Sequence, residues 1–565
     1  MDVCFIYNGS EKKLECAEYA WSNIANRAGL NYHMKPFSGT FLSFCYGNKP
    51  ENISNSYLWM PSCSNCFENE TKLELAGNLT SSFANEEIPI FSEIHEVTGE
   101  IIGSIKTKTE SNIVPVLSRK SYNGLECIFA GFDLLNAVFS LLTFKNEETS
   151  NNDVLKRHDT MKHILIKSNM KEMPVIDIYA ELMKKLFWNL AKSRSSVFLI
   201  KGMYPGNQKG ALIITHDVDR MGYIYKQPSY LQLKRITKAL LKKEVFSFNE
   251  LISSIRNPLK DPYWKIDEIL GWEKEKGIKA DYFFLANPSD PFCYRYDIRK
   301  PELGNKINEV ISRNHSVGLH SSIEAFSSLE QLIMEKEMLE RICNKKISKV
   351  RQHYLLFDYG KSPERFKEAG LNIDAGISFH DETGFRAGTS YPFKYFNHNQ
   401  ITAFPLSLMD GALLFKKDID HWDDFIRLFN SIYKMNGIHH WLIHPRTWFE
   451  DEFKGWKEFF KKAFEFAYSK QLWQVTLDEL VNWLENRNLV RMSHLSTKPD
   501  RWFILNTCNE KIQMTFNVLS QNEFTIELYR NQESKPFTRE RNFQLELNAG
   551  EEIIIVAKIG KSLNA

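Results

Sequence analysis

Two aspartates close an apolar segment near the middle of the chain. After residues 211–215 come His216, Asp217, Val218 and Asp219. In an extended chain, residues i and i+2 project to the same side, so the carboxylates of Asp217 and Asp219 are expected on one face of a strand end. Two carboxylates this close need a cation or a shared proton, and a divalent metal ion supplies the cation while leaving one carboxylate free as a base. The structural alternative is that both aspartates cap helices.

A second polar group follows the short apolar run at 316–319. His320 stands at its end, and Ser321, Ser322 and Glu324 come directly after it. A neutral imidazole is a good ligand for zinc and similar ions, and a carboxylate four residues later reaches the same ion if the chain turns into a helix. We therefore expect His320 and Glu324 to be metal ligands. Taken alone, a histidine at a strand end is more often a hydrogen-bonded structural residue.

Together these segments resemble the polysaccharide deacetylase family, also called the NodB-homology fold, a distorted (β/α) barrel that removes acetyl groups from sugars. The resemblance implies that Asp217 is a general base and Asp219 a metal ligand. The second motif of the family is His-Ser/Thr-x-x-His, and here Glu324 replaces its last histidine. A carboxylate in place of an imidazole makes the site richer in oxygen, so manganese, iron or magnesium compete better with zinc for the single divalent ion that we expect.

Residues 350–354, Val-Arg-Gln-His-Tyr, resemble the third motif of the family. Its arginine holds the catalytic aspartate by a charge-assisted hydrogen bond, a role that the resemblance gives to Arg351. The usual prolines are absent, and His353 stands where one of them would be. His353 is expected to complete the metal shell; substrate contact or simple packing are its alternatives. Tyr354 is an expected substrate contact.

Residues 441–445, Trp-Leu-Ile-His-Pro, resemble the last motif, whose histidine protonates the leaving group, so His444 is the candidate general acid.

Residues 384–393 resemble a segment of deacetylase-like proteins that carry an extra N-terminal domain. Within this segment Arg386 is expected to bridge a site carboxylate or an anionic sugar group, unless it is a buried arginine that braces a loop. His216 is the remaining expected substrate contact.

The pattern around these motifs predicts an α/β fold with three domains. From residue 198 to 487, short β-type runs alternate with amphipathic helices, which is typical of parallel strands with crossover helices, closed as a barrel or opened as a doubly wound sheet. Residues 1–197 predict an α/β domain of unknown role. Residues 488–565 contain short runs rich in β-branched and aromatic residues, several of them alternating, with turn signals between the runs. This pattern predicts a small antiparallel β-sandwich. The strands expected in the barrel are 210–215, 280–286, 316–319, 349–352, 375–378, 403–405 and 439–443.

Composition limits the partners of this 565-residue chain. With 43% hydrophobic and 25% charged residues it has the composition of a globular protein, and its net charge of +2 favours neither nucleic acid nor an anionic membrane. Its nine cysteines are scattered, and its first residues lack the basic end and apolar stretch of a signal peptide, so we expect a cytoplasmic protein. The most apolar window, 125–144, is interrupted by Glu126 and Asp133, so no membrane span is expected.

The sequence thus predicts a metal-dependent hydrolase that removes acetyl groups from an N- or O-acetylated sugar or polysaccharide precursor. In this scheme the metal polarises the acetyl carbonyl, Asp217 takes a proton from water and His444 protonates the departing amine or alcohol. Two alternatives remain. One is a catalytically impaired protein that binds glycan or acts as a scaffold, favoured by Glu324 and the missing prolines. The other is a hydrolase of a different C–N amide bond.

Overall fold

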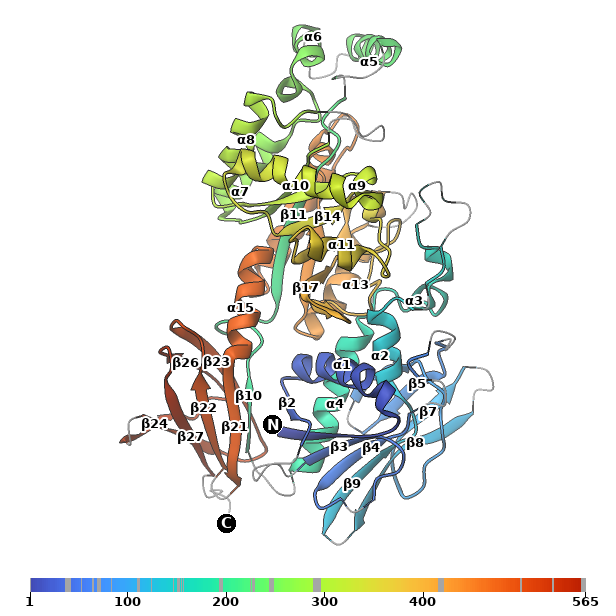
Figure 1. Ribbon diagram of the computed structural model, residues 1–565, viewed down its shortest axis with the longest axis vertical. Coiled ribbons are helices and arrows are strands. Elements are labelled where there is room, and N and C mark those ends of the chain that lie inside the picture. Colours follow the sequence, from blue (N-terminus) through green and yellow to red (C-terminus); the bar gives the residue numbers. More distant parts are fainter. Residues whose placement is uncertain are drawn as a thin grey trace.

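The computed structural model describes residues 2–559 (Figure 1), apart from 36–41, 52, 63–65, 69–72, 83, 109–111, 123, 146, 150–152, 154, 156, 193–196, 224, 226–228, 243–247, 288–295, 415–420, 498–499 and 531–532. Three regions are visible: a helix-rich barrel, a mixed sheet with its helices, and a β-sandwich. Among the described helices, none combines the length and the apolar character that crossing a membrane requires.

The first region is a nine-stranded mixed sheet with helices on one face. Its strands are β1 (Asp2–Asn8), β2 (Asn31–His33), β3 (Leu42–Gly47), β4 (Ser56–Met60), β5 (Gly77–Ser81), β6 (Ala84–Ile90), β7 (Glu100–Thr107), β8 (Ile113–Tyr122) and β9 (Leu125–Ala130), in the order β2-β1-β3-β4-β9-β8-β7-β5-β6. The helices are α1 (Glu11–Ala28), α2 (Leu134–Leu142), α3 (Ile164–Lys167) and α4 (Val175–Ala191). Helix α1 also contacts the barrel, because the Tyr19 hydroxyl donates to the Lys394 carbonyl at 2.8 Å.

The barrel sheet runs β16-β17-β15-β14-β13-β12-β11-β19-β18, with β20 beside β11. Its strands are β11 (Ala211–Val218), β12 (Asp281–Leu285), β13 (Ser316–Ser321), β14 (Lys349–Gln352), β15 (Ile373–Ile377), β16 (Phe393–Tyr395), β17 (His398–Pro405), β18 (Leu408–Met409), β19 (Ile438–Leu442) and β20 (Trp473–Gln474). All neighbours are parallel except β16 and β17. Each strand predicted from the sequence is present.

Helices cover the outside of this sheet. They are α5 (Ser229–Lys242), α6 (Phe248–Arg256), α7 (Ile266–Lys276), α8 (Pro301–Ser312), α9 (Ile323–Ser327), α10 (Leu329–Cys343), α11 (Ser362–Glu368), α12 (Asp410–Leu414), α13 (His421–Lys434), α14 (Trp456–Tyr468) and α15 (Leu477–Leu489). Helices α5 and α6, which the sequence did not suggest, project from the top of the molecule in Figure 1.

One short segment closes the sheet into a distorted barrel. After β17, the Leu406 N–H donates to the Ile377 carbonyl at 2.8 Å, and the Ser407 N–H donates to the His440 carbonyl at 3.0 Å. These bonds link β15 to β19, which lie towards opposite ends of the sheet. The expected α/β deacetylase-type barrel is therefore confirmed. Because the strands are parallel, their carboxyl ends meet at one rim, where the chemistry of such barrels collects.

The third region is a β-sandwich of two antiparallel sheets, β10-β23-β26 and β21-β22-β27-β24-β25. Its strands are β10 (Val197–Lys201), β21 (Val490–Thr497), β22 (Asp500–Asn506), β23 (Ile512–Ser520), β24 (Phe524–Arg530), β25 (Glu533–Thr538), β26 (Asn542–Leu547) and β27 (Glu552–Ile559). The barrel boundary predicted at residue 198 falls inside β10. Strand β10 pairs with β23 and buries Val197 and Leu199 in the sandwich core, a long-range pairing that its local pattern does not encode.

Candidate active site

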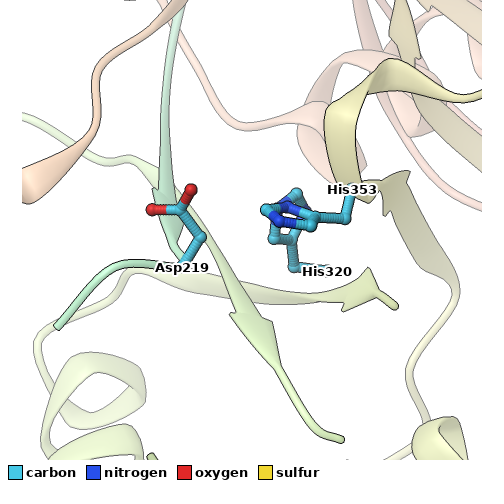
Figure 2. Close-up of side chains that lie close together, drawn as sticks. All are labelled: Asp219, His320 and His353. Carbon is cyan, nitrogen blue, oxygen red and sulfur yellow. The ribbon is translucent and has the colours of Figure 1, made fainter. Parts of the chain in front are cut away.

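Three buried side chains meet at the carboxyl rim of the barrel. Asp219 follows β11, His320 lies in β13 and His353 follows β14. One potential ligand atom from each lies within 4.8 Å of the other two. In Figure 2 the two imidazole rings overlap in projection, with the Asp219 carboxylate to one side of them. His320 Nε2 and His353 Nδ1 are 2.8 Å apart.

His320 is held in the tautomer that a metal ligand needs. Its Nδ1 lies 2.9 Å from the Arg351 carbonyl, which can only accept, so Nδ1 carries the proton and Nε2 turns a lone pair to the cluster. Burial lowers the pKa of His320, which keeps the ring neutral at neutral pH. The same backbone contact fixes the ring orientation, as second-shell hydrogen bonds do at metal sites.

His353 is positioned by an unusual turn. The next two residues, Tyr354 and Leu355, both adopt left-handed backbone conformations, with φ of 58° and 54°. Such conformations cost on the order of 1–3 kcal/mol in non-glycine residues and concentrate at functional sites. Burial, with help from His320, holds the pKa of His353 well below its ordinary value. Its Nε2 is buried and has no hydrogen-bond partner among the described residues.

Asp219 stays ionised despite its burial. Burial by itself raises the pKa of this carboxyl, but the positive charges of His444 and Arg446 outweigh it and leave the pKa below the ordinary value. One carboxylate and two neutral imidazoles thus face one point, a donor set that zinc, iron and manganese accept.

Asp217 occupies a separate position beside this cluster. Its Oδ1 accepts a hydrogen bond of 2.7 Å from Arg351 Nη1, and its Oδ2 lies 3.8 Å from His320 Nδ1. Arg351 is fully buried and also donates from Nε to the Ala375 carbonyl at 2.8 Å. One oxygen of Asp217 is therefore held in place, while the other is left to take up a proton.

His444, two residues after the end of β19, faces Asp219 across the rim. Its Nδ1 lies 2.7 Å from Asp410 Oδ1, its backbone N–H donates to Asp410 Oδ2 at 2.7 Å, and its Nε2 lies 3.9 Å from Asp219 Oδ2. Burial alone lowers the pKa of His444, but the two carboxylates outweigh it and raise the pKa to about 9. The ring is thus protonated at neutral pH. Sequence reasoning missed Asp410, although it too follows a short apolar run that ends a strand.

These groups line a cavity of about 470 Å³. Asp217, Asp219, His320, His353 and His444 all contribute to its wall, and so does the expected substrate contact Tyr354. The structure therefore brings together, around one space, most of the residues that the sequence proposed for catalysis and metal binding.

Glu324 does not belong to this group, which corrects the expected metal shell. The strand ends at Ser321, and Ser322 caps helix α9, so the chain turns away before residue 324. The Glu324 side chain is exposed and accepts a hydrogen bond from Asn287 at 3.1 Å. Among the described residues, His353 provides the ligand atom that Glu324 was expected to give.

His216 and Arg386 are corrected as substrate contacts. His216 alternates with Asp217 along β11 and therefore points outward, where Nε2 meets Glu273 of α7 at 2.9 Å and Nδ1 meets the Ile443 carbonyl at 2.9 Å. Arg386 is 1% exposed and pairs with Glu147, with Oε2 at 2.5 Å from Nη2. Neither lines the cavity. The buried arginine that braces a loop, left open from the sequence, is what the structure contains.

No family model matches the chain, and no curated protein matches it. Among solved structures, it is similar to Agd3, a carbohydrate deacetylase, with 8% identity and a TM-score of 0.36 over 99% of this chain and 98% of that one. It is also similar to a protein from Mycobacterium smegmatis assigned as a polysaccharide deacetylase (12% identity, TM-score 0.35, 52% of this chain and 96% of that one). A third similar structure is PuuE allantoinase, with 13% identity and a TM-score of 0.33 over 49% of this chain and 91% of that one. The chain is thus similar in structure to polysaccharide deacetylases.

Proposed function

We propose that this protein is a metal-dependent deacetylase that hydrolyses an acetyl group on a sugar. The observation that carries the proposal is the convergence, around one cavity, of three kinds of group. These are the possible ligand atoms of Asp219, His320 and His353, the Arg351-held carboxylate of Asp217, and the Asp410-held imidazole of His444.

Asp219, His320 and His353 would hold the ion. One nitrogen of each ring can serve as a ligand: His320 Nε2 carries a lone pair, and His353 keeps a buried nitrogen, Nε2, that a purely structural cluster would leave unsatisfied. When bound, a divalent ion at this site supplies a Lewis acid for the acetyl carbonyl and lowers the pKa of water.

The remaining steps belong to the side chains. Asp217 takes a proton from the water whose oxygen attacks the acetyl carbon, while Arg351 keeps the carboxylate in position. The bond from the acetyl carbon to the sugar nitrogen or oxygen then breaks, and His444 gives its Nε2 proton to the departing atom. Asp410 orients His444 and stabilises its charged form. Acetate and a free amine or alcohol are the products.

The test is acetate release from a panel of N- and O-acetylated sugars and oligosaccharides by the full-length protein. Measurements are made after removal of metal with a chelator and after re-addition of zinc, manganese, iron or magnesium. We expect acetate only with metal, together with about one tightly bound ion per chain by elemental analysis. Release of acetate that is unaffected by complete metal removal contradicts the proposed mechanism. A protein that binds no divalent ion at micromolar concentration contradicts it as well.

A further inference from the structure

Three arginines line the cavity and take no part in the steps above. Arg220 directly follows Asp219, Arg446 lies two residues after His444, and Arg157 comes from the region before the barrel. Two residues of the loop after β15, His380 and Asp381, complete this side of the wall.

Arg446 is the least satisfied of these cations. Its Nε is buried without a hydrogen-bond partner, and within the described ranges no carboxylate forms an ion pair with it. Its guanidinium does have a ring contact, 5.8 Å from the centre of Phe453. The residue lines the cavity, and its guanidinium carries further N–H donors that can bind a ligand oxygen.

Arg157 is brought to the cavity by a docked segment of the N-terminal region. Asp153 Oδ2 accepts from its Nε at 2.8 Å and lies 2.7 Å from its Nη2, which orients the guanidinium. The segment is attached to the barrel loop, because the Thr160 hydroxyl donates to Asp381 Oδ1 at 2.7 Å. Lys171 and Glu382 add an ion pair at 2.5 Å. The N-terminal region is therefore part of the cavity wall.

The proposed mechanism leaves one arginine of the cavity wall, Arg446, without a carboxylate partner among the described residues. Asp217 is paired with Arg351, and Asp219 would be neutralised by the ion. Asp381 accepts from Thr160 and lies 3.5 Å from His380. Arg157 is paired with Asp153, whereas Arg446 has no carboxylate partner among the described residues; both line the cavity, and planar guanidinium groups suit carboxylate and phosphate oxygens.

We propose that the cavity selects an acetylated sugar that carries an anionic group, a carboxylate or a phosphate, which Arg446 and Arg157 bind. The inference rests on the proposed deacetylase function and names its substrate class. It also assigns a role to the N-terminal region, which supplies one of the two arginines.

The experiment compares three matched probes, N-acetylglucosamine, N-acetylglucosaminuronic acid and N-acetylglucosamine 1-phosphate, on the zinc-supplemented full-length protein. Binding is measured by calorimetry and turnover by acetate release. For wild type we expect kcat/KM at least about tenfold higher for one anionic probe than for the neutral sugar, and the preferred probe distinguishes carboxylate from phosphate. In Arg446→Gln and Arg157→Gln the anionic-to-neutral ratio should fall about tenfold, mainly through KM. The exposed Arg256→Gln is the matched control and should keep the wild-type ratio.

The two hypotheses fail in different ways. Equal kcat/KM for neutral and anionic probes in wild type and in both variants overturns the anionic substrate and leaves the deacetylase standing. Binding of an anionic probe that weakens in Arg446→Gln, without acetate from any probe, supports the anion site and contradicts deacetylation of these probes. An unchanged ratio in both cavity variants overturns the assignment of the arginines even if wild type prefers the anion.

Discussion

Arg351 reaches from β14 to donate a hydrogen bond of 2.7 Å to Asp217, which lies in β11 on the far side of two intervening strands. The guanidinium is fixed on its other edge, because His440 Nε2 lies 3.1 Å from Nη2 and Nδ1 of the same ring lies 3.2 Å from the Pro405 carbonyl. Burial holds the pKa of His440 well below its ordinary value, so this neutral ring accepts from Arg351 and donates to Pro405. The position of the proposed base is thus set by the interior of the barrel.

Asp217→Asn should abolish most of the activity and leave the metal in place. The amide keeps an oxygen for Arg351 but cannot accept the proton of water, and loss of a general base costs roughly 10²- to 10⁴-fold in rate. We expect kcat for acetate release to fall by at least about 100-fold, with the metal content of wild type by elemental analysis. Wild-type kcat in the Asp217→Asn variant would contradict the assignment of the base.

His320→Ala and His353→Ala should each weaken binding of the divalent ion by at least about 100-fold, because a ligand lost from the shell costs more than the roughly 10- to 100-fold of a supporting residue. Isothermal calorimetry of the chelator-treated protein measures this directly. Glu324→Gln is the matched control, since Glu324 lies outside the cluster. If Glu324→Gln weakened binding as much as His353→Ala, the corrected metal shell would be wrong.

Asp410→Asn should lower kcat and spare metal binding. The two bonds of 2.7 Å from His444 to Asp410 orient the ring, and an amide in place of the carboxylate no longer stabilises the imidazolium. We expect kcat to fall by roughly 10²- to 10⁴-fold, with a smaller change in KM, because the same change at the carboxylate that orients the histidine of a Ser-His-Asp triad costs about 10⁴-fold. Because Asp410 acts through His444, His444→Gln and the double variant should be about equally slow. A double variant much slower than His444→Gln would show that Asp410 acts independently.

His439 should make the protein less stable in mild acid. Both of its ring nitrogens are buried without partners among the described residues, and the ring stacks on Phe429 with centroids 4.2 Å apart. Burial lowers the pKa of His439 to about 3. Below the unfolded pKa of about 6.5, the unfolded chain binds a proton that the folded state does not, so stability falls as pH is lowered towards 3, by up to about 1.4 kcal/mol per unit.

His439→Phe should remove this dependence, because the phenyl ring keeps the stacking and carries no proton. Urea unfolding at pH 7, 6 and 5 measures it: the free energy of unfolding should decline less in the variant than in wild type. The exposed His95→Gln is the control and should follow wild type. Parallel pH curves for wild type and His439→Phe would exclude this histidine as the cause.

Arg386→Met should destabilise the fold without changing KM. The variant leaves Glu147, whose side chain is 12% exposed, without its partner, and breaking a buried pair costs about 3–5 kcal/mol. Arg299→Met is the control, because the exposed Arg299 pairs with Asp297, and ion pairs of exposed arginines contribute little to stability. Thermal unfolding and kinetics of both variants provide the test. A raised KM at unchanged stability would restore Arg386 as a substrate contact.

The sequence determined what its local patterns encode. Apolar runs that end in polar residues located the strands β11, β13, β14 and β19 and placed Asp217, Asp219, His320 and His444 at their ends. Hydrophobic periodicity also indicated amphipathic helices between the barrel strands, because one buried face imposes a repeat on the residues themselves.

Only the tertiary structure decided which of these residues face one another. Glu324 and His353 looked equally able to complete the metal shell, but a helix cap turns one away and a left-handed turn directs the other inward. Strand β10 was not among the predicted strands, and its pairing with β23 depends on the fold. Asp410 reaches His444, and Arg446 and Arg157 reach the cavity, from three separate parts of the chain; these contacts depend on how the barrel closes and on where the N-terminal region docks. Such contacts are invisible in local patterns because they join residues that are far apart along the chain.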